Sequence, residues 1–263
     1  MYRNILVRTE DSVGRITLNR PERHNAFDDQ TIAELSDALA AMEASAEVRV
    51  ILIASAGQHF CAGADLKWML RAAARGAEEN LVDARKFATM LGCLARMPKP
   101  TVARVQGVAY GGGVGLVSAC DIAVATADAR FALTEVRLGL IPAVIGPHVV
   151  AAIGPRQARR YMLTAQPFSA AEAHRLGLVH ELAVDIPALD GAVNGIVSAL
   201  LANGPQAQAE CKSLIAAVAG RPLDDPLIED TARRIARIRA TDEAREGMAA
   251  FLARRRPRWP AGD

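Results

Sequence analysis

Two short stretches of small residues constrain the fold of this chain most, because each connects a predicted strand to a predicted helix. Residues 61–65 (Cys-Ala-Gly-Ala-Asp) follow the β-type run 50–53, and the glycine-rich residues 107–115 follow the β-type run 101–105. Turns with little or no side chain let another molecule approach the backbone closely. Two such turns can aim two backbone N–H groups at one oxygen atom, the arrangement called an oxyanion hole. We therefore expect a site for a thioester or similar carbonyl compound rather than for a metal or a nucleic acid.

The composition excludes several classes of protein. The chain has 263 residues, of which 51% are hydrophobic, enough for one large domain with a small extension. Its net charge of +2 gives no field of one sign that would attract nucleic acid or an anionic membrane. No apolar run is long enough to span a bilayer, and the N-terminus has no signal-peptide pattern. We expect a cytoplasmic protein with neither nucleic-acid nor membrane partners.

The cysteines and histidines give no metal-binding pattern. The four cysteines, at positions 61, 93, 120 and 211, form no C-x-x-C pair, which is typical of small buried side chains in a reducing compartment. A catalytic Cys61 is the alternative, although no histidine partner is evident from the sequence. The five histidines lack a spacing such as H-x-x-x-H, so we expect no metal site. His148, beside a proline-containing turn, is the histidine that could line a pocket.

The predicted elements repeat as strand, turn and helix along the first part of the chain. A hairpin turning at residues 10–12 opens it, Asp28 is placed to cap a first helix, and Gly76 interrupts a helical stretch over residues 66–96. This repetition favours an α/β superhelix over an open, doubly wound sheet.

Strands are predicted to stop after residue 145, and helices to fill the remainder. Ser169 begins a capping-box helix that ends at Gly177. Amphipathic helical stretches then follow at residues 188–202, 205–218, 225–239 and 242–255. We therefore divide the chain into a core of residues 1–190, which carries the site, and a helical region of residues 191–263 suited to oligomerisation.

An oxyanion hole can stabilise the enolate of a thioester, and forming or protonating an enolate requires a group that transfers a proton. Glu135 is the best candidate for this group. It lies in the largely apolar stretch 131–142, where burial would raise the pKa of a carboxyl group toward a useful value. The alternative for Glu135 is an ion pair with Arg137 or another arginine. Asp121 also lies among apolar residues, and for it we expect a structural role as a cap or an ion-pair partner.

Eight segments of the chain resemble the crotonase superfamily, the enoyl-CoA hydratase/isomerase family. They are residues 18–26 (LNRPERHNA), 60–67 (FCAGADLK), 98–103 (PKPTVA), 111–113 (GGG), 120–123 (CDIA), 139–142 (GLIP), 169–173 (SAAEA) and 246–252 (EGMAAFL). The resemblance implies an α/β fold built as a ββα superhelical spiral, whose C-terminal helices mediate homotrimers that commonly pair into hexamers. It also implies an acyl-CoA thioester as substrate, with no separate cofactor because CoA is part of the substrate.

The same resemblance assigns residues to the site. The backbone N–H groups of Ala64 and Gly112 would form the oxyanion hole for the thioester oxygen. Arg23 and His24 would lie near the pantetheine or the phosphates of CoA. The adenine end of CoA would be cradled by residues 62–67, in particular by Ala62, Asp65, Leu66 and Lys67.

Hydratases of this family use two glutamates to hold the attacking water, and this chain keeps one of them. Glu135 matches the second glutamate, whereas the position of the first is occupied by Gly115. A single retained glutamate is also the pattern of family isomerases, in which one base shuttles a proton. Hydration, double-bond isomerisation, thioester hydrolysis and a non-catalytic CoA-binding role therefore remain open at this point.

Residues 135–145 and 156–161 are similar to the methylglutaconyl-CoA hydratase group, which acts on branched glutaconyl-CoA thioesters. We therefore expect hydration of such a thioester, with Gly115 and Pro142 lining the substrate. The missing side chain of Gly115 is expected to leave room beside Glu135. A distal carboxylate of the substrate would then help to position water where the first glutamate would otherwise stand.

Two further interpretations concern nucleotides and phosphates. A dinucleotide-binding dehydrogenase is excluded, because Leu116 stands where the third glycine of that motif is required. The arginines at positions 254, 255, 256 and 258 would either reach the CoA phosphates of a neighbouring subunit or form a solvated basic tail.

Overall fold

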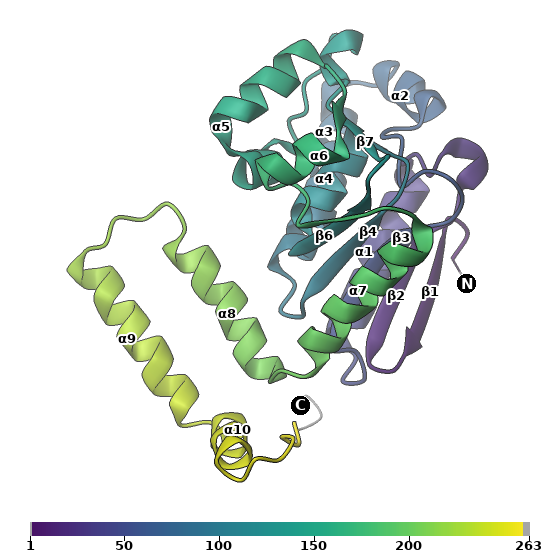
Figure 1. Cartoon of the computed structure of the whole chain (residues 1–263). Helices are drawn as coiled ribbons and strands as arrows, with labels where there is room; N and C mark the ends of the chain where they lie inside the picture. Colours follow the sequence, from purple (N-terminus) through teal and green to yellow (C-terminus); the bar gives the residue numbers. More distant parts are fainter. Residues whose placement is uncertain (1, 260–263) are drawn as a thin grey trace.

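The computed structural model describes residues 2–259 and arranges their strands in two sheets (Figure 1). The larger sheet has six strands in the order β1-β2-β3-β4-β6-β9, and the smaller has three in the order β5-β7-β8. Strands β1 and β2 pair antiparallel, as do β7 and β8, and the other neighbours pair in parallel. The strands are β1 (Ile5–Glu10), β2 (Val13–Leu18), β3 (Val50–Ser55), β4 (Thr101–Val105), β5 (Val108–Tyr110), β6 (Ile122–Thr126), β7 (Arg130–Ala132), β8 (Phe168–Ser169) and β9 (Glu181–Ala183).

Successive turns of the chain place one strand in each sheet and then a helix. The run β4-β5-α4 is followed by β6-β7 and α5, and then β8, α6 and β9 complete the pattern in a different order. This is the ββα spiral expected for the fold. The helices are α1 (Asp29–Ala44), α2 (Leu66–Ala73), α3 (Ala77–Arg96), α4 (Gly112–Ala119), α5 (Gly146–Thr164), α6 (Ala170–Leu176), α7 (Ile186–Leu201), α8 (Pro205–Val218), α9 (Asp225–Arg239) and α10 (Asp242–Leu252), with 3-10 turns η1 (Pro21–Arg23) and η2 (Glu135–Leu138).

Local sequence signals determine several of these boundaries. The hairpin turns at Asp11 and Ser12, whose φ angles of 48° and 64° are left-handed. The Asp28 carboxylate accepts a hydrogen bond from the Thr31 amide at 2.8 Å and so begins α1, as its position predicted. Gly76 separates α2 from α3, which confirms the predicted interruption.

Strand β3 is buried on both faces, because helices cover both sides of the larger sheet. Its Ile51 and Ile53 belong to the main core, which α1, α3 and α4 complete. Its Val50 and Leu52 belong to a second cluster formed with Leu189, Val193 and Val197 of α7. Figure 1 shows α7 across one face of the sheet and α1 on the other. Burial on both sides explains why this strand reads as a continuous apolar run.

Two features of the second half differ from the sequence-based expectation. Strands do not stop after residue 145, since β8 extends the smaller sheet and β9 extends the larger one. These strands have two and three residues, too few for an alternating pattern to be recognised. The boundary expected after residue 190 falls within α7, which packs on the sheet. Residues 1 and 260–263, at the outer ends of the two expected regions, lie outside the described residues.

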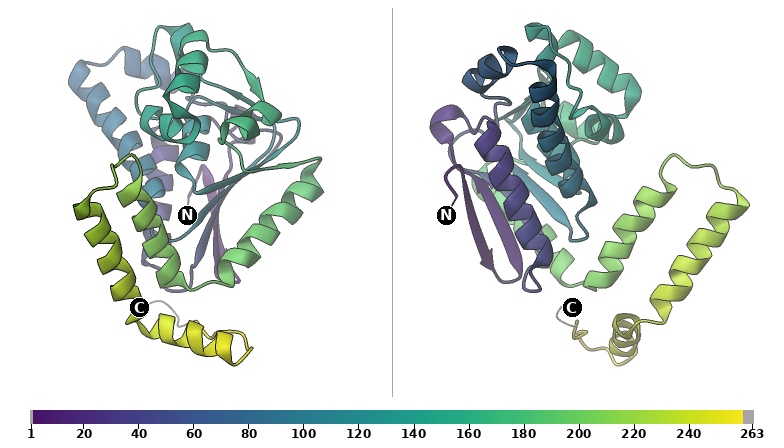
Figure 2. Two further views of the ribbon diagram at one scale, coloured as in Figure 1. Left: turned by 60° about the vertical axis from the view of Figure 1, so that its left-hand side comes forward. Right: turned by 180° about the vertical axis from the view of Figure 1, so that it is seen from behind.

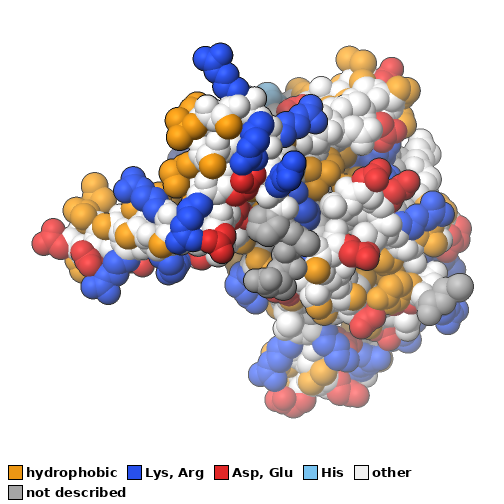
Figure 3. Space-filling view, turned by 90° about the horizontal axis from the view of Figure 1, so that it is seen from below, with side chains coloured by type: hydrophobic (Ala, Val, Ile, Leu, Met, Phe, Trp, Pro, Cys, Tyr) orange, Lys and Arg blue, Asp and Glu red, His pale blue; other side chains and the backbone are white. Residues whose placement is uncertain are grey.

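Helices α8, α9 and α10 form an arm that extends away from the sheets (Figures 1 and 2). Figure 3 shows hydrophobic side chains on the surface of this arm. They include Ile215, Leu223, Ile228, Ile235, Met248, Phe251 and Leu252, all exposed. Among residues 2–259 no single helix is long and apolar enough to cross a membrane; α7 and α8 reach that composition together but are bent by 103°.

Polar contacts hold the helices of the arm together and also join the arm to the core. The buried Glu243 carboxylate on α10 accepts hydrogen bonds from the Gln206 and Ala207 amides, at 3.0 and 2.8 Å, in the first turn of α8. The Lys212 ammonium on α8 donates to Asp121 at 2.5 Å, which confirms that Asp121 has a structural role. The carboxylate of Glu243 thus satisfies two amides that no residue within α8 can satisfy.

We expect the substitution Glu243→Ala to lower the free energy of unfolding by about 1–3 kcal/mol, because two amides of α8 lose a buried acceptor. Thermal and urea unfolding at fixed protein concentration would measure this loss. The matched control is Glu229→Ala, which removes an exposed carboxylate paired with Arg233 and should cost no more than about 0.5 kcal/mol. Equal losses for the two variants would contradict this role of Glu243.

Candidate active site

The two small-residue turns lie against each other. The Cys61 amide donates to the Val108 carbonyl at 3.0 Å, and the Tyr110 amide donates to the Cys61 carbonyl at 2.9 Å, so Cys61 pairs with β5 as a short strand. A Cβ atom on Gly113 would lie 2.5 Å from the Cys61 carbonyl oxygen, and one on Gly63 would lie 3.0 Å from the Tyr110 carbonyl oxygen. Glycine is therefore required where the backbones of the two turns meet.

Ala64 lies at the exposed end of the first turn, bridged to Phe27. The Phe27 amide donates to the Gly63 carbonyl at 2.7 Å, and the Asp65 amide donates to the Phe27 carbonyl at 2.8 Å. In such a parallel bridge the residue between the two bonds turns its own N–H and C=O to the opposite side. The Ala64 amide is therefore directed away from Phe27, and Ala64 is exposed.

Gly112 is the first residue of α4, and Gly111 precedes it with φ 47° and ψ −115°, a conformation open only to glycine. The Gly111 amide donates to the Ala132 carbonyl at 2.8 Å, which fixes the start of the helix against β7. The first amides of a helix have no partner within it and carry partial positive charge. A Cβ on Gly111 would lie 3.9 Å from Gly63 Cα, so the positive end of α4 begins beside the first turn.

Glu135 begins η2 and brings a carboxyl group to the same place. A Cβ on Gly111 would lie 3.0 Å from Glu135 Oε1, and the buried Oε2 has no hydrogen-bond partner among residues 2–259. Burial raises the pKa of Glu135, opposed by a hydrogen bond from its own backbone amide. The alternative of an ion pair with Arg137 is wrong, because the Arg137 guanidinium donates to the Ala165 carbonyl at 2.7 Å. A carboxyl group with one buried oxygen that no hydrogen bond satisfies is a mark of a functional site.

Two aromatic rings cover the start of α4, and sequence reasoning missed both. A Cβ on Gly112 would lie 2.9 Å from Phe27 Cδ2 and 3.2 Å from Phe87 Cζ. The two rings pack with centroids 5.5 Å apart. Apolar cover strengthens any hydrogen bond made to the amides beneath it, because it excludes water. Phe87 lies in α3 and Phe27 just before α1, and in the sequence alone neither can be distinguished from an ordinary core residue.

The residues expected to cradle CoA begin α2. The Asp65 carboxylate caps this helix, accepting from the Lys67 and Trp68 amides at 2.9 and 3.2 Å, and pairs with Arg20 at 3.2 Å. Burial alone would raise the pKa of Asp65, but the two amides and the Arg20 charge lower it overall. The side chain of Asp65 is thus used to start the helix, and the exposed side chains here are those of Leu66 and Lys67.

The loop with Arg23 and His24 lies next to the first turn. The Ala62 amide donates to the His24 carbonyl at 2.9 Å, so the structure brings together these two segments that lie far apart in the sequence. Arg23 and His24 are exposed, and the His24 ring lies 5.0 Å from the ring of His59. Burial of His59, and the nearby His24, lower the pKa of His59.

The expectation that Gly115 leaves room beside Glu135 is wrong. A Cβ atom on Gly115 would lie 2.2 Å from Ile145 Cγ2 and 2.8 Å from Ile145 Cβ, so the side chain of Ile145 fills this space. Pro142 is half-buried in the loop that leads from η2 to Ile145. The sequence shows that a side chain is missing at position 115, but it does not show which residue packs there.

The remaining candidates have structural environments. Cys61 is fully buried, and burial raises the pKa of its thiol to about 12, which rules out a reactive thiolate. His148 is half-buried in α5, and both burial and the charge of Arg96 lower its pKa. Among residues 2–259 no three His, Cys, Asp or Glu side chains gather where they could hold a metal ion.

Comparison with known proteins identifies the family to which this arrangement belongs. The sequence model of the enoyl-CoA hydratase/isomerase family matches residues 8–262, and the chain is therefore a member of that family. Crotonyl-CoA hydratase of Syntrophomonas wolfei is 33% identical over 258 residues, which cover 97% of each chain. The chain is thus similar to curated relatives over its whole length.

Solved structures give the same result. An enoyl-CoA hydratase from Shewanella pealeana superimposes with a TM-score of 0.95 at 41% identity, covering 98% of this chain and 96% of the other. AtuE of Pseudomonas aeruginosa superimposes with a TM-score of 0.93 at 40% identity, covering 97% and 98%. The crotonase fold and the enoyl-CoA hydratase/isomerase class of enzyme are therefore both established for this chain.

The raised pKa of Glu135 predicts a pH-dependent effect on stability. The contribution of the protonated carboxyl is complete below its usual pKa of 4.5 and is lost as the pH rises through the raised folded-state value. The substitution Glu135→Gln removes the buried charge, so it should raise the melting temperature at pH 8 and change it less at pH 4. The exposed control Glu47→Gln should show no such pH-dependent difference. A Glu135→Gln variant less stable than the parent protein at pH 8 would contradict the prediction.

Proposed function

We propose that this chain adds water across the double bond of a 2-enoyl-CoA thioester, with Glu135 as the acid/base group. The observation that carries the proposal is the half-buried carboxyl of Glu135 beside Gly111, where α4 begins, whose Oε2 is buried and has no hydrogen-bond partner among residues 2–259. A group that transfers protons needs a raised pKa and a partner that arrives only with the substrate. The raised pKa of Glu135 supports the first requirement, and its unsatisfied Oε2 would find its partner in the bound substrate and water.

The amides of Ala64 and Gly112 would hold the thioester oxygen. The attacking water oxygen bonds to C3 of the acyl chain while the Glu135 carboxylate takes one proton from that water. The electron pair of the double bond then moves onto the thioester oxygen as an enolate, which the two N–H groups stabilise. C2 finally takes the proton back from Glu135, and the product is a 3-hydroxyacyl-CoA. Loss of one such N–H donor costs about 3–4 kcal/mol of transition-state stabilisation in other enzymes.

The CoA portion would lie along the exposed segments on either side of Ala62. Arg23 and Lys67 are exposed cations on these segments, and the hydrogen bond from Ala62 to His24 holds the segments together. Cations of this kind suit the phosphates of CoA. Of the C-terminal arginines, Arg255 is already paired with Glu246 at 2.6 Å, which favours a structural role for that residue.

The proposed substrate is a branched glutaconyl-CoA. Position 115 carries no carboxylate, so the second polar group that holds water must come from another source, and a distal carboxylate on the substrate supplies it. The packing of Ile145 against Gly115 supports this proposal, because it leaves an apolar wall where a hydratase with two glutamates has a carboxylate. The same observation favours one alternative, an isomerase in which Glu135 alone moves a proton between C4 and C2.

Product analysis would separate these reactions. The purified protein is incubated with crotonyl-CoA, 3-methylglutaconyl-CoA and a 3-enoyl-CoA, and mass spectrometry detects the gain of one water or a shifted double bond. We expect water gain with the glutaconyl thioester, and we expect Glu135→Gln to lower kcat by about 10²–10⁴-fold. The control Glu47→Gln should retain the parent rate. Equal hydration rates for crotonyl-CoA and the glutaconyl thioester would contradict the substrate, and conversion of the 3-enoyl-CoA alone would favour the isomerase.

The arm supports a proposal about assembly. Phe251 and Leu252 at the end of α10 are 83% and 82% exposed, which is costly for a lone subunit. We propose that these faces are buried in a homotrimer, alone or paired as a hexamer. The double substitution Phe251→Asp with Leu252→Asp should shift the mass measured by light scattering toward the monomer. Val184→Asp, a change at an equally exposed apolar residue of the core, should leave the assembly intact. A parent protein that is already monomeric would contradict the proposal.

A further inference from the structure

The side chain of Ile145 occupies the space that a side chain at position 115 would need. The Cβ of an alanine at position 115 would already lie 2.2 Å from Ile145 Cγ2 and 2.8 Å from Ile145 Cβ, distances that real Cβ atoms essentially never show. The nearest other atom, Leu91 Cδ1, lies 3.6 Å away, an ordinary contact. Of the atoms nearest to a Cβ at position 115, only those of Ile145 are close enough to obstruct it.

Ile145 and Glu135 face successive turns of the same helix. The Gly115 amide donates to the Gly111 carbonyl at 3.1 Å, so the two glycines are one turn of α4 apart, about 6 Å along the axis. The Cα of Gly111 faces the Glu135 carboxyl, and the Cα of Gly115 faces the Ile145 methyl group. Ile145 thus provides an apolar surface one turn from the carboxyl.

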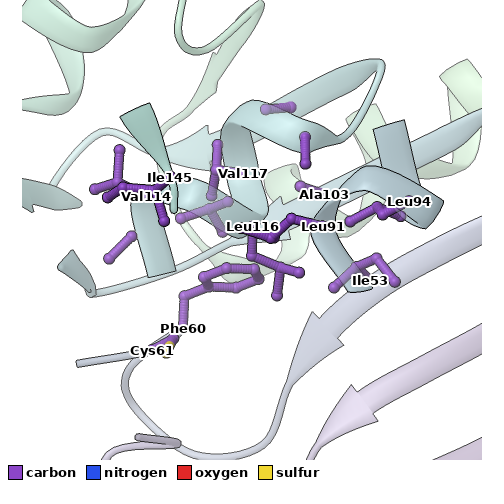
Figure 4. Close-up of a cluster of buried hydrophobic side chains, with 14 of the residues drawn as sticks. Ile53, Phe60, Cys61, Leu91, Leu94, Ala103, Val114, Leu116, Val117 and Ile145 are labelled. Carbon is purple, nitrogen blue, oxygen red and sulfur yellow. The ribbon is translucent and has the colours of Figure 1, made fainter. Parts of the chain in front are cut away.

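Ile145 is held firmly in this place. It is 3% exposed and belongs to the main core, and the Val149 amide donates to its carbonyl at 3.0 Å as α5 begins. Figure 4 shows Ile145 beside Val114 of α4, within the cluster that also contains Leu91 and Val117. Because cores are close-packed, this side chain cannot withdraw without displacing its neighbours.

We propose that Ile145 is a specificity-determining residue: by filling the place of a second carboxylate, it restricts hydration to acyl-CoA substrates that bring their own carboxylate to hold water. This inference rests on the proposed function. Two glutamates can hold the attacking water for any 2-enoyl-CoA. Where an isoleucine replaces one of these carboxylates, the second group that holds the water must be a polar group of the substrate.

Paired substitutions test this role. We expect Gly115→Glu alone to give no gain in crotonyl-CoA hydration, because Ile145 blocks the new side chain. Ile145→Gly removes both obstructing atoms. The double variant Gly115→Glu with Ile145→Gly should therefore raise kcat/KM for crotonyl-CoA at least tenfold. It should also lower the ratio of kcat/KM for 3-methylglutaconyl-CoA to that for crotonyl-CoA. The matched control is Gly115→Glu with Ile145→Val, which keeps Cβ and a γ-methyl group and should remain blocked. A substitution that affects packing alone would not alter the ratio of the kcat/KM values for the two substrates.

Smaller substitutions decide the outcome if the glutamate variants fail to fold. Gly115→Ala should lower the melting temperature, and Ile145→Gly should restore part of that loss in the double variant. Additive losses in this cycle would overturn the inference. A gain from Gly115→Glu without any change at Ile145, or no gain in a folded double variant, would also overturn it.

A failure of this inference differs from a failure of the proposed function. If Glu135→Gln abolishes turnover while the substitutions at Ile145 and Gly115 leave the substrate ratio unchanged, the hydratase proposal stands and the role of Ile145 is wrong. If Glu135→Gln keeps the parent rate, the proposed function itself is wrong, and with it the inference that rests on it.

Discussion

The backbone contact between two turns is the constraint on which the site depends. Gly113 packs on the Cys61 carbonyl, and Gly63 packs on the Tyr110 carbonyl, at distances that leave no space for a side chain. Because Cys61 pairs with β5, the smaller sheet continues into the first turn and sets its separation from α4. The start of α4, the exposed Ala64 and the Glu135 carboxyl are therefore positioned by strand pairing rather than by long loops.

The site also contains an energetic conflict. The Glu135 carboxyl is half-buried, and the part of the chain that the structure describes offers no hydrogen-bond partner to its Oε2, an arrangement that disfavours the charged form and the folded state with it. The large core around β3, with apolar side chains on both faces of that strand, offsets this cost. Catalytic groups are commonly held in such unfavourable surroundings, because the surroundings that raise their pKa are those that exclude water.

Much of the fold could be predicted from the sequence where the determining signal is local. Asp28 caps α1, Gly76 interrupts the helical stretch before α3, and helices α8 and α9 have the predicted bounds 205–218 and 225–239. Strands β8 and β9 could not be predicted, because their two or three residues are strands only through the neighbours they pair with.

The residues of the site also fall into two groups, those that the sequence predicts and those that only the folded structure reveals. The glycine turns and Glu135 could be predicted from the sequence, since each needs only a residue type in a recognisable setting. The occupant of the space at Gly115 could not, because Ile145 is thirty positions away and reaches it only through the packing of α5 on α4. The aromatic cover of Gly112 by Phe87 is a further contact that only the folded chain reveals.

Cys61 is the first residue of the first turn, and the full burial of its thiol keeps that thiol protonated. Oxidants and alkylating reagents act on the thiolate, and they need access to the sulfur. Cys61 lies beside the candidate catalytic groups but is therefore unreactive toward such reagents. Cys211 on α8 is exposed and Cys93 and Cys120 are half-buried, so a reagent that needs an accessible sulfur would react first at Cys211 and not at the buried Cys61 beside the candidate catalytic groups.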